Sequence, residues 1–142
     1  MSAAADLLLA VPSEASAIVA SEYPLGTFKG VNIDGLDPLK VAALHCLFTP
    51  RAFAEVLREY QPVAQASPSG PWLVKLPGEF TGFLTHVSPQ DQSDLAARWA
   101  STDQAQEDGW SEQDADGYLG RLIPFAHTAS FEGKDLYLWI YS

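Results

Sequence analysis

The chain has 142 residues, of which 47% are hydrophobic and 18% are charged, so it is expected to fold as one domain over residues 1–142 and not to be disordered. Its 18 acidic and 8 basic side chains give a formal charge of −10. This negative charge excludes nucleic acid and anionic membrane surfaces as favourable partners.

The first third of the chain predicts a strand followed by two helices. Residues Asp6 to Val11 are a short apolar run that ends at a proline, which is typical of a strand, and residues 13–21 contain enough alanine for a helix. The glycines in residues 22–35 predict a connection. Asp37 and Pro38 then supply an N-cap and a first-turn proline. The helix that they begin is apolar almost all round, which predicts a buried central helix.

The middle of the chain alternates between helical patterns and turns. Apolar residues recur at helical spacing in residues 53–60 and 80–87, and again after Ser88 and Pro89, which supply a further N-cap and first-turn proline. Residues 61–70 are rich in Pro, Ser, Ala and Gln and predict a loop. A short strand is expected from Trp72 to Leu76, between that loop and the next helix.

The closing segment predicts a strand with two apolar faces. The last helix is expected to end at Gly133, and LYLWIY follows. Alternate side chains point to opposite faces, so aliphatic and aromatic residues separate: Leu136, Leu138 and Ile140 against Tyr137, Trp139 and Tyr141. We expect helices to cover one face and a loop or helix the other, while the aromatic face also suits a dimer partner or a ligand. The fold class is therefore α+β, a mostly helical single domain with a small sheet that includes the C-terminal strand.

The stretch SEQDADGYLG, residues 111–120, admits two interpretations. As an EF-hand calcium loop it places Asp114, Asp116 and Gly117 at the third, fifth and sixth positions, but the twelfth residue, which must carry a bidentate carboxylate, is an isoleucine. As a helix start it provides Ser111 as N-cap and Asp114 three residues later. The second interpretation explains more residues, so we expect a helix start here.

Acidic residues are concentrated in this part of the chain, with no lysine or arginine among them: Asp103, Glu107, Asp108, Glu112, Asp114 and Asp116. One interpretation is a solvated loop and helix start, since acids near a helix N-terminus complement its dipole. The other is a docking surface for a basic protein partner. The sequence leaves both interpretations open.

No catalytic or metal-binding pattern is present. Cys46 is the only cysteine, so no intrachain disulfide forms, and on its apolar helix it is expected to be an inert core thiol. Its neighbour His45 points about 100° away, so the two do not form a nucleophile and base. The histidines lack ligand spacing, and no P-loop, GxGxxG or GxSxG motif occurs, so neither a metal nor a cofactor is expected. His45 is the best candidate for a functional polar group.

No signal peptide or membrane span is predicted. The stretch MSAAADLLLAV lacks a positively charged start, and no apolar run reaches the ~20 residues of a spanning helix. We therefore expect a cytoplasmic protein.

Two segments are similar to parts of a bacterial family. The segment LDPLKVAALHCLFT resembles the Leu-Asp…Leu-His…Leu-Thr helix of the uncharacterised YfbM-like proteins, and EGKDLYLWI resembles their C-terminal glycine and apolar strand. The two segments cover about a sixth of the chain. The resemblance implies a small bacterial α+β domain with no established reaction, and it gives weight to His45 as the polar residue of note in the matching helix.

The leading functional hypothesis is a non-catalytic protein-binding module, of the inhibitor or immunity type, that acts on a basic protein as a monomer or weak homodimer. The negative charge, the acidic cluster and the missing active-site motifs support it. The alternative is an enzyme or a small-ligand-binding protein with a pocket near His45, lined also by Trp72, Tyr118 and Trp139. A deep pocket with His45 beside a carboxylate would favour that alternative.

Overall fold

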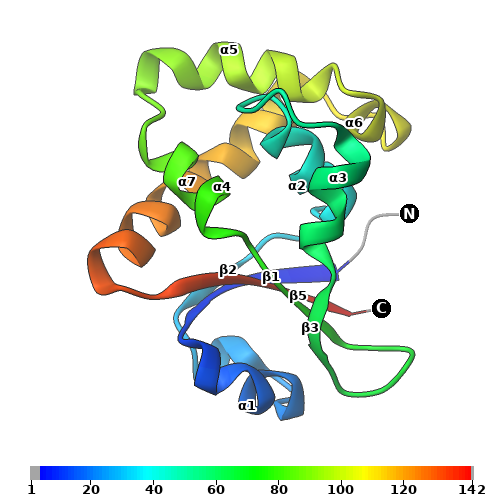
Figure 1. The fold of residues 1–142 in the computed structure, drawn as a ribbon, viewed down its shortest axis with the longest axis vertical. Coiled ribbons are helices and arrows are strands. Elements are labelled where there is room, and N and C mark those ends of the chain that lie inside the picture. Colours follow the sequence, from blue (N-terminus) through cyan, green and yellow to red (C-terminus); the bar gives the residue numbers. More distant parts are fainter. Residues whose placement is uncertain (1–3, 142) are drawn as a thin grey trace.

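The computed structural model describes residues 4–141 and shows helices packed against a five-stranded antiparallel sheet (Figure 1). The strands are β1 (Ala4–Ala10), β2 (Gly30–Asn32), β3 (Pro62–Gln65), β4 (Trp72–Lys75) and β5 (Asp135–Tyr141). The α-helices are α1 (Ala15–Ala20), α2 (Pro38–His45), α3 (Phe53–Leu57), α4 (Gly78–Thr85), α5 (Pro89–Ala100), α6 (Asp103–Glu107) and α7 (Glu112–Glu132). Short 3-10 turns occupy Pro12–Glu14, Pro24–Gly26 and Arg58–Tyr60. The predicted α+β class, with the C-terminal strand in the sheet, is confirmed.

The C-terminal strand lies at the centre of the sheet, whose strand order is β2-β1-β5-β4-β3. β5 pairs with β1 along the whole of both strands, beginning with Ala4 opposite Tyr141. On its other side it pairs with β4, where Leu73 lies opposite Trp139. The first and last strands of the chain are therefore neighbours, and the sheet is incomplete until the final residues are in place.

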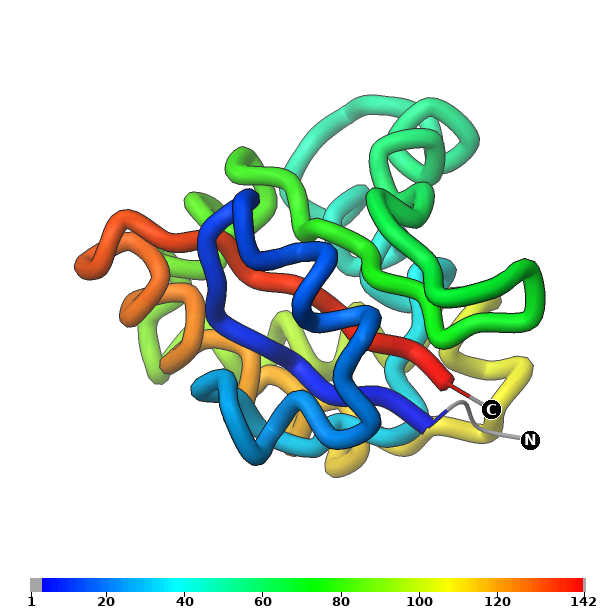
Figure 2. Tube along the Cα trace, turned by 90° about the horizontal axis from the view of Figure 1, so that it is seen from below, coloured from blue at the N-terminus to red at the C-terminus, as the bar shows by residue number. Residues whose placement is uncertain are grey.

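The two faces of the sheet are covered unequally. Helices α2 to α7 lie on one face, and α1 with the turn at residues 24–26 lies on the other (Figure 1, Figure 2). Ile18 of α1 packs there with Leu8, Leu73 and Trp139 in a small second core. Trp139 is only 5% exposed. The prediction that both faces of the last strand are covered is confirmed.

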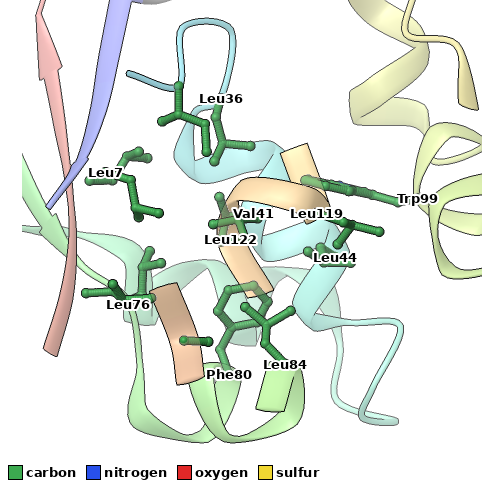
Figure 3. Close-up of a cluster of buried hydrophobic side chains, with 14 of the residues drawn as sticks. Leu7, Leu36, Val41, Leu44, Leu76, Phe80, Leu84, Trp99, Leu119 and Leu122 are labelled. Atoms are coloured by element: carbon green, nitrogen blue, oxygen red, sulfur yellow. The ribbon is translucent and has the colours of Figure 1, made fainter. Parts of the chain in front are cut away.

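The main core lies between the sheet and the larger helical layer (Figure 3). Alternation along β1 directs Leu7 into it, and α2 contributes Val41 and Leu44, all fully buried. Trp99 of α5 joins this core, and its Nε1 donates to the Lys40 carbonyl oxygen at 2.8 Å. Residues 40–45 of α2 are buried, as predicted for a central helix, although Leu39 in its first turn is exposed.

Local capping signals place the helix starts where the sequence predicts them. Asp37 accepts a hydrogen bond from the backbone amide of Lys40 at 3.0 Å and caps α2. Ser111 and Asp114 form a reciprocal capping box at the start of α7. The stretch SEQDADGYLG therefore opens a helix, so its backbone does not have the loop conformation of an EF-hand.

Two short edge strands depart from the sequence prediction. Residues 61–70, predicted as a loop, contain β3, which pairs with β4 through Ala64 opposite Leu73. Residues 22–35, predicted as a connection, contain β2, which pairs with β1. Neither strand has a fully buried side chain. Both are defined by the neighbour they pair with rather than by an apolar alternation of their own.

Candidate functional site

The acidic residues predicted as a docking surface gather at one end of the helical layer, on α6 and the start of α7 (Figure 1). Asp103 begins α6, Glu107 ends it, and Glu112 lies in the first turn of α7. All three side chains are exposed to solvent. The structure thus leaves these three carboxylates exposed on consecutive segments of the chain.

Two of the six acids have structural roles. Asp108 pairs with Lys40, whose ammonium group also lies 2.7 Å from Asp37 Oδ2 and is almost completely buried. Burial alone would lower the pKa of Lys40, but its hydrogen bonds to Asp108 and Asp37 raise it. The bond to Lys40 in turn lowers the pKa of Asp108. Asp114 belongs to the capping box of α7, so neither residue is free to serve a partner alone.

A cleft of about 350 Å³ lies between α5 and α7, and five residues line it: Ser93, Ala96, Glu112, Gln113 and Asp116. Asp116 accepts a hydrogen bond from Gln92 Nε2 at 3.0 Å, which holds this carboxylate at the cleft. Two carboxylates at one concave place suit a basic side chain, above all a guanidinium with its paired donors. We call this feature the α5–α7 cleft.

His45 lies at the centre of a second polar arrangement. Its ring is fully buried, with Nδ1 2.9 Å from the Tyr60 hydroxyl and Nε2 2.8 Å from Glu79 Oε1. Arg51 also donates to Glu79, at 3.2 Å. Burial raises the pKa of Tyr60, and the hydrogen bond from His45 lowers the pKa of Glu79. An imidazole with its proton on Nε2 satisfies both bonds when the Tyr60 hydroxyl donates to Nδ1 and Glu79 accepts from Nε2.

His45 lies beside a carboxylate, as the enzyme hypothesis requires, but it does not open into a pocket. Phe80 and Phe83 pack against the imidazole with centroid separations of 5.4 and 6.0 Å. Tyr60 is buried with it. Both ring nitrogens are within hydrogen-bond distance of a partner, Tyr60 in the core and Glu79 at the surface. The arrangement joins α2, α4 and the turn at residues 58–60.

The other residues predicted to line a pocket with His45 lie in three different places. Tyr118 of α7 stacks on Trp110 at a centroid separation of 4.5 Å. Trp139 belongs to the small core beside α1, and Trp72 lies at the start of β4. The structure therefore does not bring these four side chains together.

A pocket that the sequence did not predict opens between α4, α5 and the loop that follows α2. We call it the α4–α5 pocket, and its volume is about 360 Å³. Its lining is half apolar and half polar: Phe48, Phe83, Val87 and Leu95, with His86, Asp91, Asp94 and Arg98. Phe83 also contacts the His45 ring, so the pocket lies beside the buried histidine without including it.

No protein-family model matches the chain, and neither does any curated protein or solved structure. The resemblance to the YfbM-like proteins therefore stays a prediction from two short segments. Within residues 4–141, no three His, Cys, Asp or Glu side chains lie together in a way that would hold a metal ion. None of the helices in this part of the chain is long and apolar enough to cross a bilayer.

Cys46 is only partly buried, so the prediction of a core position is wrong for this side chain. It packs against the edge of the main core, directly after the buried end of α2. Burial raises the pKa of Cys46 in spite of the nearby Arg51. Since the thiolate is the nucleophile, a raised pKa makes this cysteine a weak one at neutral pH.

Proposed function

We propose that this protein is a non-catalytic binding module, of the inhibitor or immunity type, that docks a basic protein onto its acidic end. We define the acidic end by the exposed carboxylates of α6 and the start of α7: Asp103, Glu107, Glu112 and Asp116. The α5–α7 cleft carries the proposal. An acidic stretch alone describes many solvated surfaces, whereas a cleft between two carboxylates provides a seat for a basic side chain.

The charge around this cleft is one-sided. Residues 91–116 contain eight acids and a single base, Arg98. Such a field attracts a basic partner over a distance and raises its association rate, and salt weakens the effect because the Debye length is only ~10 Å at 0.1 M. We therefore expect an association rate that falls with ionic strength.

The test compares three tagged proteins in pull-downs from a lysate of the native host, eluted with a salt gradient. One is the unmodified protein, and the second carries Glu107→Gln, Glu112→Gln and Asp116→Asn in the acidic end. The third is a control with the same change in charge on other surfaces: Glu22→Gln, Glu132→Gln and Asp135→Asn. Asp108 and Asp114 are left intact because they hold Lys40 and the start of α7.

A basic protein should be retained by the unmodified protein and the control, be released by salt, and be lost from the acidic-end variant. With the purified partner, the association rate of that variant should fall at least about tenfold. Recovery of no basic protein, or equal retention by all three, would overturn the proposal.

A small-ligand-binding function is the second candidate, and the α4–α5 pocket favours it. The pocket adjoins the His45 arrangement through Phe83 and lies outside the acidic end. A ligand in this pocket would contact the ring of Phe83 but not His45. No catalytic step through His45 is proposed there, because its ring does not line the pocket.

A further inference from the structure

One face of α5 forms a wall of the α4–α5 pocket. Asp91, Asp94, Leu95 and Arg98 are spaced at i, i+3, i+4 and i+7, which places them in one stripe along the helix. Leu95 is buried, whereas the three charged side chains are exposed. The wall therefore presents carboxylates and a guanidinium on either side of an apolar residue.

The two opposite charges nearest each other on this wall are not paired. Asp94 and Arg98 have the i,i+4 spacing at which acids and bases form ion pairs, and at the same spacing Arg51 and Glu55 approach to 3.2 Å. Within residues 4–141, Arg98 has no carboxylate within 4.0 Å. Its NH2 group makes a long bond of 3.5 Å to the Leu47 carbonyl oxygen. Both charged groups are therefore available to a ligand.

The facing wall is aromatic. Phe48, in the loop after α2, stacks on Phe83 of α4 with a centroid separation of 5.2 Å and an angle of 14° between the rings. Both side chains line the pocket together with Val87. A further ring can stack or pack edge-on against this pair, as aromatic side chains do at such separations. The volume of about 360 Å³ lies within the range of small-molecule sites.

We propose that the α4–α5 pocket binds a free aromatic α-amino acid. The ligand's carboxylate pairs with Arg98, its ammonium group pairs with Asp94, and its ring packs against Phe48 and Phe83. The neighbouring opposite charges of an α-amino acid match the neighbouring opposite charges on α5, while a ligand with one charge leaves one side chain of the wall without a partner. This site is independent of the acidic end.

The experiment is calorimetric titration of the full chain with L-phenylalanine and L-tryptophan. Saturable 1:1 binding in the micromolar to millimolar range is expected for at least one of them. For 2-phenylethylamine, which lacks the carboxylate, and 3-phenylpropionate, which lacks the ammonium group, the affinity should be at least about tenfold weaker. L-Alanine tests the contribution of the ring and should bind more weakly still.

Two pairs of variants locate the site. Arg98→Leu and Asp94→Asn should each lower the affinity for the amino acid at least about tenfold, because each removes one charge-assisted contact. Arg58→Leu and Glu22→Gln are the matched controls, since these exposed residues do not line the pocket, and they should leave the affinity unchanged. All four substitutions are at exposed positions, and thermal unfolding of each variant verifies the fold.

Absence of saturable binding up to about 10 mM of either amino acid overturns the proposal. The proposal is also overturned if the one-charge analogues bind as tightly as the amino acid. It is overturned as well if Arg98→Leu and Asp94→Asn bind the amino acid as tightly as the unmodified protein does. The acidic-end variant separates the two proposals: it should bind the amino acid normally even where it has lost a basic partner.

Discussion

Lys40 shows how a single charged residue can be buried in the centre of a helical layer. Its side chain is 4% exposed, and its ammonium group contacts Asp37 and Asp108 and lies 5.7 Å from the centre of the Trp110 ring. Two carboxylates and an aromatic face together replace the water that the ammonium group loses. Asp108 of the acidic cluster thereby connects α2 to the segment between α6 and α7.

Replacing Lys40 by methionine should destabilise the protein. Lys40→Met keeps the length of the side chain but leaves Asp37 and Asp108 facing each other without a cation, so the free energy of unfolding should fall by about 1–3 kcal/mol. Urea denaturation measures the change. Adding Asp108→Asn should recover part of the loss, and the exposed control Lys29→Met should change stability by less than about 0.5 kcal/mol. No loss in Lys40→Met would show that the buried ion pairs contribute nothing.

Glu79 makes the stability of the fold depend on pH. The hydrogen bond from His45 is the main reason that its pKa lies below the ordinary 4.5, and Arg51 adds to the effect. Because the folded state binds its proton less readily than the unfolded state, the stabilisation is present above about pH 4.5 and is lost as the pH falls through the lowered pKa.

Glu79→Gln should therefore flatten the acid side of the stability profile. The glutamine retains an oxygen that accepts from His45 but has no charge to titrate. Free energies of unfolding measured between about pH 7 and pH 3 should fall less steeply in this variant than in the unmodified protein. Glu22→Gln, in an exposed turn, is the control with an unchanged slope. Parallel profiles for Glu79→Gln and the unmodified protein would contradict the assignment.

At the scale of elements, α7 depends on its N-terminal cap. Ser111 Oγ accepts a hydrogen bond from the Asp114 amide at 3.1 Å, and Asp114 Oδ2 accepts one from the Ser111 amide at 2.8 Å. Ser111→Ala should lower the free energy of unfolding by about 1 kcal/mol, the usual cost of losing such a cap. Chemical denaturation with Ser130→Ala as an exposed control within the same helix tests this. Equal stabilities of the two variants would mean that the cap is dispensable.

The elements that the sequence predicts well are those with local signals. The caps at Asp37 and Ser111 and the apolar residues of α2 and β5 are enough to place those elements. β2 and β3 carry no such signal, because their side chains are largely exposed and one of them contains Pro62. Edge strands are specified by the strand beside them, which no single segment of sequence encodes.

The two candidate sites also differ in how far the sequence alone predicts them. The acidic cluster is contiguous in sequence, so its location could be predicted, although the partner of Asp108 could not, because Lys40 is far away in the chain. The α4–α5 pocket needs Phe48, Phe83 and the stripe on α5 to meet in space. The i,i+3,i+4,i+7 recurrence in α5 mixes charge with Leu95, which resembles an ordinary helix surface until the opposite wall is known.

At the scale of the whole molecule, the topology joins the two ends of the described chain. β1 and β5 are adjacent along their whole length, and β5 separates β1 from β4. Pairing of such distant segments closes a long loop, which slows folding relative to a helical protein of the same size. β5 contributes to both cores, with Leu136 and Leu138 in the main core and Tyr137 and Trp139 in the smaller one.

Net charge is also a property of the whole molecule, and it predicts a response to salt. The formal charge is −10, and one end of the helical layer carries a large share of it. Raising sodium chloride from about 0.01 M to 0.15 M shortens the Debye length from about 30 Å to about 8 Å, which screens repulsion among the exposed carboxylates.

The same screening weakens attractive pairs, but those of Lys40 are largely buried and are screened less. The Tm should therefore rise by about 2–5 °C over this range, as calorimetry can measure. The acidic-end variant should show a smaller rise than the charge-matched control, because it lacks three carboxylates from the stretch of the chain where acids are most concentrated. A Tm that falls with salt would mean that surface ion pairs outweigh the repulsion, and that the acidic end is not the dominant electrostatic feature of this molecule.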